Sequence, residues 1–293
     1  MHKAGFVNII GNPNVGKSTL MNALVGEKLS IITSKSQTTR HRIMGIVNGE
    51  DFQIVYSDTP GIVNPHYKLH QSMMTFVSSA IEDADIFLLV TEMGETLKKE
   101  ETLEKIIESK TPIILIINKI DLSSQEEVND KITYWQEIIP RAIIIPASAL
   151  NGFNIEKVFD EIIENLPESP PYFPKDELTD KTMRFFVSEI IREKILMHYR
   201  KEIPYSCEVV VEEYKEGYDM DRISVMIYVE RESQKAIVIG KGGSMLKRIG
   251  IESRADIEEF TGKKAYLELR VKVLKDWRND ERSLRRFGYQ NKK

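Results

Sequence analysis

A glycine-rich segment near the N-terminus constrains this sequence more than any other feature. Residues 11–18 read GNPNVGKS, which fits the pattern G-x-x-x-x-G-K-[ST], between an apolar run at residues 6–10 and an amphipathic stretch at residues 18–25. Strand, glycine loop and helix in this order form a phosphate-binding loop, where backbone N–H groups and the positive end of the helix face the phosphate oxygens. The motif predicts an α/β domain that binds a nucleoside triphosphate.

Every residue of this loop is a candidate for nucleotide binding. Lys17 is expected to contact the terminal phosphates, and the Ser18 hydroxyl is expected to bind Mg²⁺. The predicted phosphate-binding residues are Gly11, Asn12, Pro13, Asn14, Val15, Gly16, Lys17, Ser18 and Thr19.

Two later segments predict that the base is guanine. The sequence NKID at residues 118–121 follows an apolar run at residues 113–117, and SAL at residues 148–150 follows the next run. A carboxylate at the C-terminal edge of such a sheet can accept hydrogen bonds from the N1–H and amine of guanine, whereas adenine presents an N1 lone pair. The predicted base-binding residues are Asn118, Lys119, Asp121, Ser148, Ala149 and Leu150.

Residues 58–62, DTPGI, are predicted to contact the γ-phosphate region. Asp58 would bind Mg²⁺ through water, and the N–H of Gly61 would follow the γ-phosphate; Thr59, Pro60 and Ile62 complete this predicted nucleotide contact. Small GTPases carry a glutamine directly after the glycine to orient the attacking water, and here that position is Ile62. We therefore expect slow intrinsic hydrolysis that is sensitive to a partner.

The polar segment at residues 33–41 contains two adjacent threonines, Thr38 and Thr39. A threonine here can bind Mg²⁺ only while the triphosphate is present, so the segment would order with GTP and be released after hydrolysis. Thr39 is favoured over Thr38 for this role, and an ordinary surface loop is the alternative. The predicted catalytic residues are Lys17, Ser18, Thr39, Asp58 and Gly61, and the predicted metal ligands are Ser18, Thr39 and, through water, Asp58.

Four prolines between residues 166 and 180 predict a domain boundary. We expect a nucleotide-binding domain at residues 1–170, a linker at 171–181 and a second domain at 182–293. Apolar runs that alternate with helical patterns predict a mostly parallel sheet covered by helices on both faces, and Asn48-Gly49 predicts one antiparallel hairpin.

The net charge of −4 is divided unequally across the predicted domain boundary. Residues 1–180 carry 16 Lys and Arg against 26 Asp and Glu, and residues 181–293 carry 25 against 19. The basic second part predicts a polyanionic partner.

The second domain is expected to follow the order α-β-β-α-α-β, an α+β unit. Residues 237–243, IVIGKGG, form a G-x-x-G turn between two predicted helices, as in KH domains, which hold about four nucleotides of single-stranded nucleic acid. A plain turn between helices is the alternative. The predicted RNA-binding residues are Ile239, Gly240, Lys241, Gly242, Gly243, Lys247 and Arg248.

The basic C-terminal tail has two equally weighted interpretations. Trp277, Tyr289, Lys292 and Lys293 stand among further basic residues, a pattern that can stack on bases and pair with phosphates. Interleaved acidic residues also fit an ordinary solvated helix.

Composition excludes several classes of protein. A single cysteine, Cys207, permits no internal disulfide, five scattered histidines do not suggest a metal cluster, and no apolar run approaches the ~20 residues of a membrane span. Without a recognisable signal peptide, we expect a cytoplasmic protein.

Together, GNPNVGKS, QTTRHR, DTPG, NKID, SAL and IVIGKGGSMLKRIG resemble, in this order, the bacterial Era family of GTPases over essentially the whole chain. The resemblance implies a GTPase domain with GTP or GDP and Mg²⁺, a type II KH domain, and binding to the 3′ end of small-subunit ribosomal RNA during maturation of the 30S subunit. It also implies that Asn14 assists a stimulating K⁺ ion. We expect a monomer, although the sequence itself leaves the oligomeric state open. A membrane-associated regulatory GTPase, peripheral at the inner membrane, is the alternative function. The RNA sequence and the direction of coupling between GTP and RNA stay open.

Overall fold

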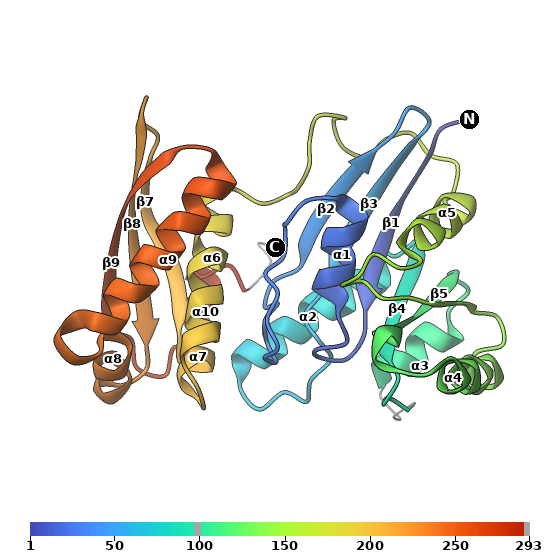
Figure 1. Cartoon of the computed structure of the whole chain (residues 1–293), viewed down its shortest axis with the longest axis horizontal. Helices are drawn as coiled ribbons and strands as arrows, with labels where there is room; N and C mark the ends of the chain where they lie inside the picture. The colour runs from blue at the N-terminus through green and yellow to red at the C-terminus, as the bar shows by residue number, and fades with distance from the viewer. Residues whose placement is uncertain (97–100, 290–293) are drawn as a thin grey trace. The chain divides into compact units, whose positions relative to one another are not determined.

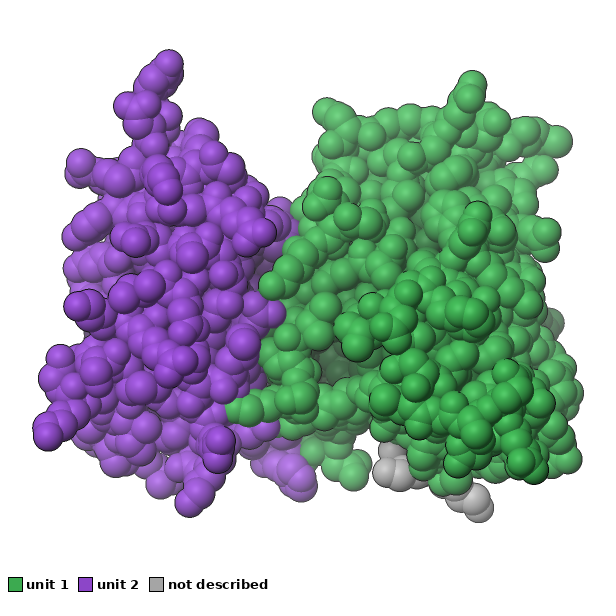
Figure 2. Space-filling model, viewed as in Figure 1, with its two compact units in different colours: residues 1–65, 73–180 green, residues 66–72, 181–293 purple. Residues whose placement is uncertain are grey.

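The computed structural model describes residues 1–96 and 101–289 of the chain. These residues form two compact units, coloured separately in Figure 2. The first unit comprises residues 1–65 and 73–180, and the second comprises residues 66–72 and 181–293. Lys292 and Lys293 of the predicted tail lie outside the described residues. None of the helices in the described part is both long and apolar enough to cross a lipid bilayer.

The first unit is built on a six-stranded sheet with the order β2-β3-β1-β4-β5-β6 (Figure 1). All neighbouring strands are parallel except β2 and β3, which form the antiparallel hairpin predicted at Asn48-Gly49. The strands are β1 (Lys3–Ile10), β2 (Ile43–Asn48), β3 (Phe52–Asp58), β4 (Ile86–Glu92), β5 (Ile113–Asn118) and β6 (Ile143–Pro146). The near-continuous apolar runs are buried because helices cover both faces of the sheet.

A helix follows each strand of this sheet except β2, which the hairpin joins to β3. The helices are α1 (Lys17–Val25), α2 (Lys68–Glu82), α3 (Glu101–Glu108), α4 (Gln125–Ile138) and α5 (Ile155–Asn165), with a short 3₁₀ helix, η1 (Ile120–Leu122). Leu103 and Ile106 of α3 share one apolar core with Trp135 of α4 and alternate residues of β4 and β5. Helices α1 and α5 contact each other, and α1 also packs against β2 and β3. The predicted mostly parallel α/β architecture is confirmed.

The proline-rich segment before residue 181 is held against the first unit. Residues 172–180, which we call the strap, run beside the edge strand β2: Ile46 N donates to Leu178 O at 2.8 Å and Met44 N to Asp180 Oδ1 at 2.9 Å. The buried amide of Gln53 anchors the start of the strap, since its Oε1 accepts from the N–H groups of residues 172 and 173 and its Nε2 donates to Phe173 O. The outer edge of the sheet is thereby covered.

The second unit contains a three-stranded sheet with the order β7-β8-β9, in which β7 and β8 are antiparallel and β8 and β9 are parallel. Its elements are α6 (Met183–His198), α7 (Ile203–Ser206), β7 (Glu208–Lys215), β8 (Met220–Val229), α8 (Glu232–Ile239), η2 (Lys241–Gly243), α9 (Ser244–Thr261), β9 (Lys264–Val273) and α10 (Glu281–Arg286). Apart from the short α7, η2 and α10, this is the predicted α-β-β-α-α-β order.

The C-terminal aromatic residues are part of the interior of the second unit. Trp277 is fully buried and its Nε1 donates to Ser206 O at 2.9 Å; Tyr289 is 2% exposed and its hydroxyl donates to Glu208 Oε2 at 2.8 Å. The interpretation of these two rings as base-stacking residues is therefore wrong, because a buried ring presents no free face to a base.

Candidate nucleotide and RNA sites

The phosphate-binding loop lies between the end of β1 and the start of α1. Gly16, the N-cap of α1, has φ of 100°, in the left-handed region that favours glycine. A Cβ at this position would lie 2.2 Å from Asn118 Nδ2, so the loop also requires glycine for its close approach to the base-binding segment. Gly61 makes a similar approach, since its Cβ would lie 2.8 Å from Pro13 Cα.

Lys17 is buried at the centre of this loop. Its Nζ donates to Gly11 O at 3.0 Å and to Asn12 O at 2.8 Å. Burial lowers the pKa of Lys17 to about 8, although the nearby Asp58 and Glu95 carboxylates partly oppose the shift. A phosphate group arriving at this loop would stabilise the charged form of Lys17.

Three oxygen-bearing side chains meet beside Lys17. Ser18 Oγ donates to Asp58 Oδ2 at 2.7 Å, Thr39 Oγ1 donates to the same oxygen at 3.1 Å, and the two hydroxyl oxygens lie 2.9 Å apart. The second oxygen, Asp58 Oδ1, is buried without a hydrogen-bond partner among the described residues. Burial raises the pKa of Asp58, against the opposing effect of Lys17 and the hydroxyl donors. Hard oxygen donors around an unsatisfied carboxylate oxygen fit Mg²⁺.

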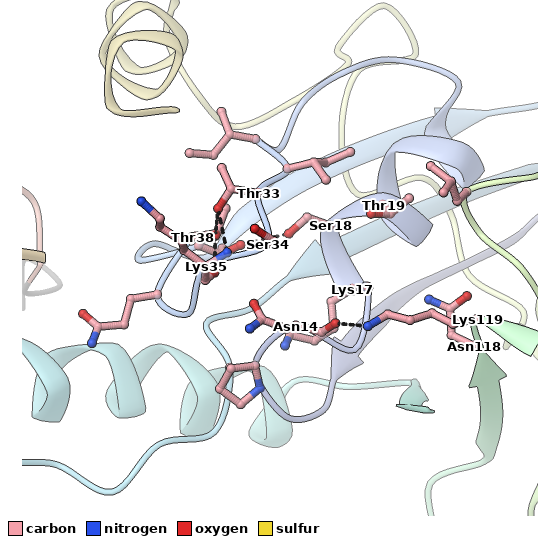
Figure 3. Close-up of a pocket in the computed structure, with 18 of the residues that line it drawn as sticks. Asn14, Lys17, Ser18, Thr19, Thr33, Ser34, Lys35, Thr38, Asn118 and Lys119 are labelled. Atoms are coloured by element: carbon pink, nitrogen blue, oxygen red, sulfur yellow. Dashed lines mark hydrogen bonds between the residues drawn. The ribbon is translucent and has the colours of Figure 1, made fainter. Parts of the chain in front are cut away.

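The adjacent Thr38 has different partners. Thr38 Oγ1 donates to Lys35 O at 2.6 Å and lies 2.6 Å from Thr33 Oγ1, within the polar segment that leads to β2 (Figure 3). Its hydroxyl is therefore used inside this segment, whereas that of Thr39 faces Ser18 and Asp58.

The two predicted base-binding segments, residues 118–121 and 148–150, lie beside the phosphate loop. Asn118 Nδ2 donates to Val15 O at 2.8 Å, while Asn118 Oδ1 accepts from the N–H of Ala149 at 3.0 Å. Ser148 Oγ donates to Asp121 Oδ1 at 2.6 Å, which fixes the carboxylate that is predicted to accept from guanine. These hydrogen bonds connect residues 118–121 with residues 148–149 and hold both segments against the phosphate loop.

Most of the predicted nucleotide residues surround one cavity of about 470 Å³. From the prediction, it is lined by Pro13, Asn14, Gly16, Lys17, Ser18, Thr19, Thr39, Gly61, Asn118, Lys119, Asp121, Ser148 and Leu150. The predicted residues that do not line it are Gly11, Asn12, Val15, Asp58, Thr59, Pro60, Ile62 and Ala149. Thr59 is fully buried and donates its hydroxyl to Ile9 O at 2.7 Å, and Ile62 lines a neighbouring cavity with Asn12.

Sequence reasoning missed several residues of this cavity. Leu122, which is 78% exposed, lies in it together with Leu150, which is 81% exposed. Exposed leucines beside Asp121, the predicted base contact, provide an apolar surface for a flat ring. Ile31 and Ile32 also line the cavity, and nothing in their residue types distinguishes them from an ordinary loop. Thr33 lines it too, within the polar segment predicted at residues 33–41.

In the second unit, the G-x-x-G turn joins α8 to α9. Ile239 ends α8, and Gly240, Gly242 and Gly243 have φ of 73°, 58° and 77°. Lys241 and Gly242 are exposed, so the turn presents backbone and a cation to the solvent.

Beside this turn lies a groove of about 430 Å³ between α9 and β9. It is lined by Gly243, Leu246, Lys247, Gly250, Ile251, Arg254, Tyr266, Leu267 and Leu269. Of the two predicted cations of α9, Lys247 lines the groove. Arg248 does not, and its Nε donates to Glu252 Oε1 at 2.9 Å. Arg254 and Tyr266 were missed, because their positions relative to the turn depend on how β9 packs beside α9.

The fold and these residues define a class of protein, a P-loop GTPase domain followed by a KH domain. Family models agree: one described as a 50S ribosome-binding GTPase matches residues 6–119, and one described as a KH domain matches residues 202–278.

Similarity to two curated relatives extends over nearly the full length of both chains. GTPase Era of Syntrophus aciditrophicus is 49% identical over 293 residues, which cover 99% of this chain and 96% of that protein. GTPase Era of Staphylococcus epidermidis is 45% identical, with 98% and 97% covered. The chain belongs to the Era family of GTPases, and the expected resemblance is confirmed.

Two solved structures match with a TM-score of 0.92 and 40% identity. One is Era in complex with MgGDPNP and nucleotides 1506–1542 of 16S ribosomal RNA, which covers 99% of both chains. The other is a variant of Aquifex aeolicus Era bound to GDP·AlF₄⁻, with 98% of this chain and 99% of that chain covered.

Proposed function

We propose that the first unit binds GTP with Mg²⁺ in the 470 Å³ cavity and hydrolyses it to GDP and phosphate. The observation that carries this proposal is that Lys17 and Asp121, the predicted phosphate and base contacts, line the same cavity. The relatives crystallised with MgGDPNP and with GDP·AlF₄⁻ support the choice of ligand.

We assign different roles to different residues of the cavity. Lys17 and the backbone N–H groups of residues 14–19 would neutralise the phosphates, and Asp121, held by Ser148, would select guanine. Ser18, Thr39 and Asp58 would hold Mg²⁺, which when bound withdraws charge from the phosphate oxygens. Ile62 has no group that orients water, so the chain relies on electrostatic stabilisation and hydrolyses GTP slowly by itself.

We propose further that the second unit binds single-stranded RNA from the 3′ end of small-subunit ribosomal RNA, in maturation of the 30S subunit in the cytoplasm. The exposed glycine turn can approach an RNA backbone closely, and the adjacent groove carries Lys247, Arg254 and the 59% exposed ring of Tyr266 for phosphates and bases. The structural relative bound to 16S ribosomal RNA nucleotides supports this partner.

GTP turnover measured with and without RNA of the small-subunit 3′ end tests both proposals. We expect turnover by the wild-type chain, stimulation by this RNA but not by a scrambled RNA of equal length, and no turnover by Lys17→Ala. Turnover that survives Lys17→Ala would contradict the assigned site. Equal stimulation by both RNAs would contradict the RNA assignment.

Sedimentation distinguishes this function from a membrane-associated regulator. With GTP present, we expect the chain to sediment with 30S subunits and not with vesicles of bacterial lipids. Sedimentation with vesicles alone would overturn the ribosomal assignment.

A further inference from the structure

Glu92 lies outside all the motifs that predict nucleotide binding. It is the last residue of β4 and pairs in register with Asn118, the last residue of β5. The parallel register brings its carboxylate to the same edge of the sheet as the base-binding segment.

The carboxylate of Glu92 contacts Lys119. Lys119 Nζ lies 2.5 Å from Glu92 Oε2 and donates to Asn14 O at 2.6 Å, so one ammonium group connects β4 with the phosphate loop. Figure 3 shows Lys119 extended toward Asn14. Both charged side chains are about one-third exposed, at 36% for Lys119 and 35% for Glu92.

The two residues joined by the Lys119–Asn14 hydrogen bond both have a strained backbone. Lys119 has φ of 62° and Asn14 has φ of 68°, in the left-handed region that residues with a Cβ seldom occupy. Such conformations persist where surrounding contacts determine them. Asn118 Nδ2 donates to Val15 O, and Lys119 Nζ donates to the preceding carbonyl, Asn14 O. Of these two donors, Lys119 is the one that also contacts a carboxylate, that of Glu92.

We propose that Glu92 is a positioning residue of the nucleotide site. It holds the Lys119 ammonium at the phosphate loop, so that the loop and the side of the cavity that holds the base keep a fixed spacing before nucleotide arrives. The inference rests on the proposed nucleotide site in this cavity.

Loss of Glu92 should weaken nucleotide binding without slowing the chemical step. Lys119 contacts the loop rather than the γ-phosphate region, so loss of Glu92 weakens GDP and GTP binding to the same extent. It raises KM for GTP and leaves kcat at saturating GTP unchanged. An ordinary exposed ion pair would contribute nothing measurable to either.

The test is the dissociation rate of a fluorescent GDP analogue in Glu92→Ala, Lys119→Met and the double variant. We expect Glu92→Ala to accelerate dissociation at least about threefold, Glu92→Gln to accelerate it less, and the double variant to match Lys119→Met, since coupled residues are not additive. Glu108→Ala, which removes an exposed glutamate at the end of α3, is the matched charge control.

A Glu92→Ala rate equal to that of Glu108→Ala would overturn the inference while leaving the nucleotide site intact. A further acceleration when Glu92→Ala is added to Lys119→Met would also overturn it, because Glu92 would then act without Lys119. Failure of the wild-type chain to bind the analogue would instead overturn the proposed function. If Glu92→Ala lowers the melting temperature of the nucleotide-free chain, the dissociation rate of Glu92→Gln is compared with that of Glu108→Ala instead.

Discussion

At the scale of single residues, hydroxyl partners distinguish two adjacent threonines that the sequence alone could only rank. Thr39 Oγ1 lies with Ser18 and Asp58, whereas Thr38 Oγ1 donates to Lys35 O. This geometry supports the preference for Thr39 as the residue that senses Mg²⁺ and the triphosphate.

Thr39→Ala is therefore expected to raise the Mg²⁺ concentration needed for half-maximal GTP turnover by about 10-fold, within the range seen when groups around a metal are lost. Mg²⁺ titrations of turnover measure this effect. Thr38→Ala is the matched control and should leave the requirement nearly unchanged. The reverse order of the two variants would contradict the assignment.

Lys17 makes nucleotide binding dependent on pH. Burial lowers the pKa of Lys17 to about 8 in the nucleotide-free protein, and a bound triphosphate favours the charged form. Above pH 8 the free protein must take up a proton when GTP binds, so GTP affinity should fall as pH rises. Below that pH the lysine is already charged and the dependence should disappear.

Calorimetric titrations with GTP, in buffers of different ionisation enthalpy, measure this proton uptake at pH 8 to 9. Lys17→Arg is the control, since arginine keeps its charge over this range while ionisation of guanine affects both proteins equally. Equal proton uptake by the wild type and the variant would show that another group is responsible.

At the scale of elements, the α8–turn–α9 segment concentrates the predicted RNA contacts. Lys241 is on the turn and Lys247 lines the groove, so both can neutralise phosphates of a bound strand. Arg248 is engaged with Glu252 on the same helix, which predicts a smaller contribution from Arg248.

The double variant Lys241→Ala, Lys247→Ala should bind single-stranded RNA more weakly and reduce the slope of log affinity against log salt by about 1.4, or 0.7 for each phosphate contact. Filter binding over a salt series measures it. The matched double variant Lys215→Ala, Lys264→Ala removes two cations that pair with Glu213 and Glu258. An equal loss of slope in both variants would mean that overall charge, rather than this segment, determines binding.

Strands and turns could be predicted where the local residue pattern indicates burial or turn geometry. Apolar runs indicated the strands of the first unit, and glycine spacing indicated both turns that carry the candidate sites. The burial of Trp277 was not predictable, because basic residues interleaved with aromatics look alike in an RNA-binding tail and in a packed segment. The pairing of the strap with β2 was also missed, since main-chain hydrogen bonds and the Gln53 amide leave no periodic trace in the sequence.

At the scale of the whole molecule, each unit contains one of the chain's two tryptophans. Trp135 belongs to the apolar core around α3 and α4, and Trp277 is buried in the second unit. Their fluorescence can therefore report the unfolding of each unit separately.

In Trp277→Phe, GDP at 100 times its Kd should stabilise the transition reported by Trp135 by about 2.7 kcal/mol, because the ligand binds only the folded first unit. In Trp135→Phe, the transition reported by Trp277 should not shift, provided that GDP still binds. Denaturant titrations with and without GDP measure both. Equal shifts would mean that the two units unfold as one.

The strap has a consequence for self-association. β2 is the outer strand of the sheet, and an uncovered edge strand offers its N–H and C=O groups to any other chain. A fragment of residues 1–180 should therefore remain monodisperse in light scattering, whereas a fragment of residues 1–170 should associate through β2. Equal behaviour of the two fragments would contradict this role. Because the strap occupies this edge, the segment between the two domains would protect the first domain from association as well as connect it to the second.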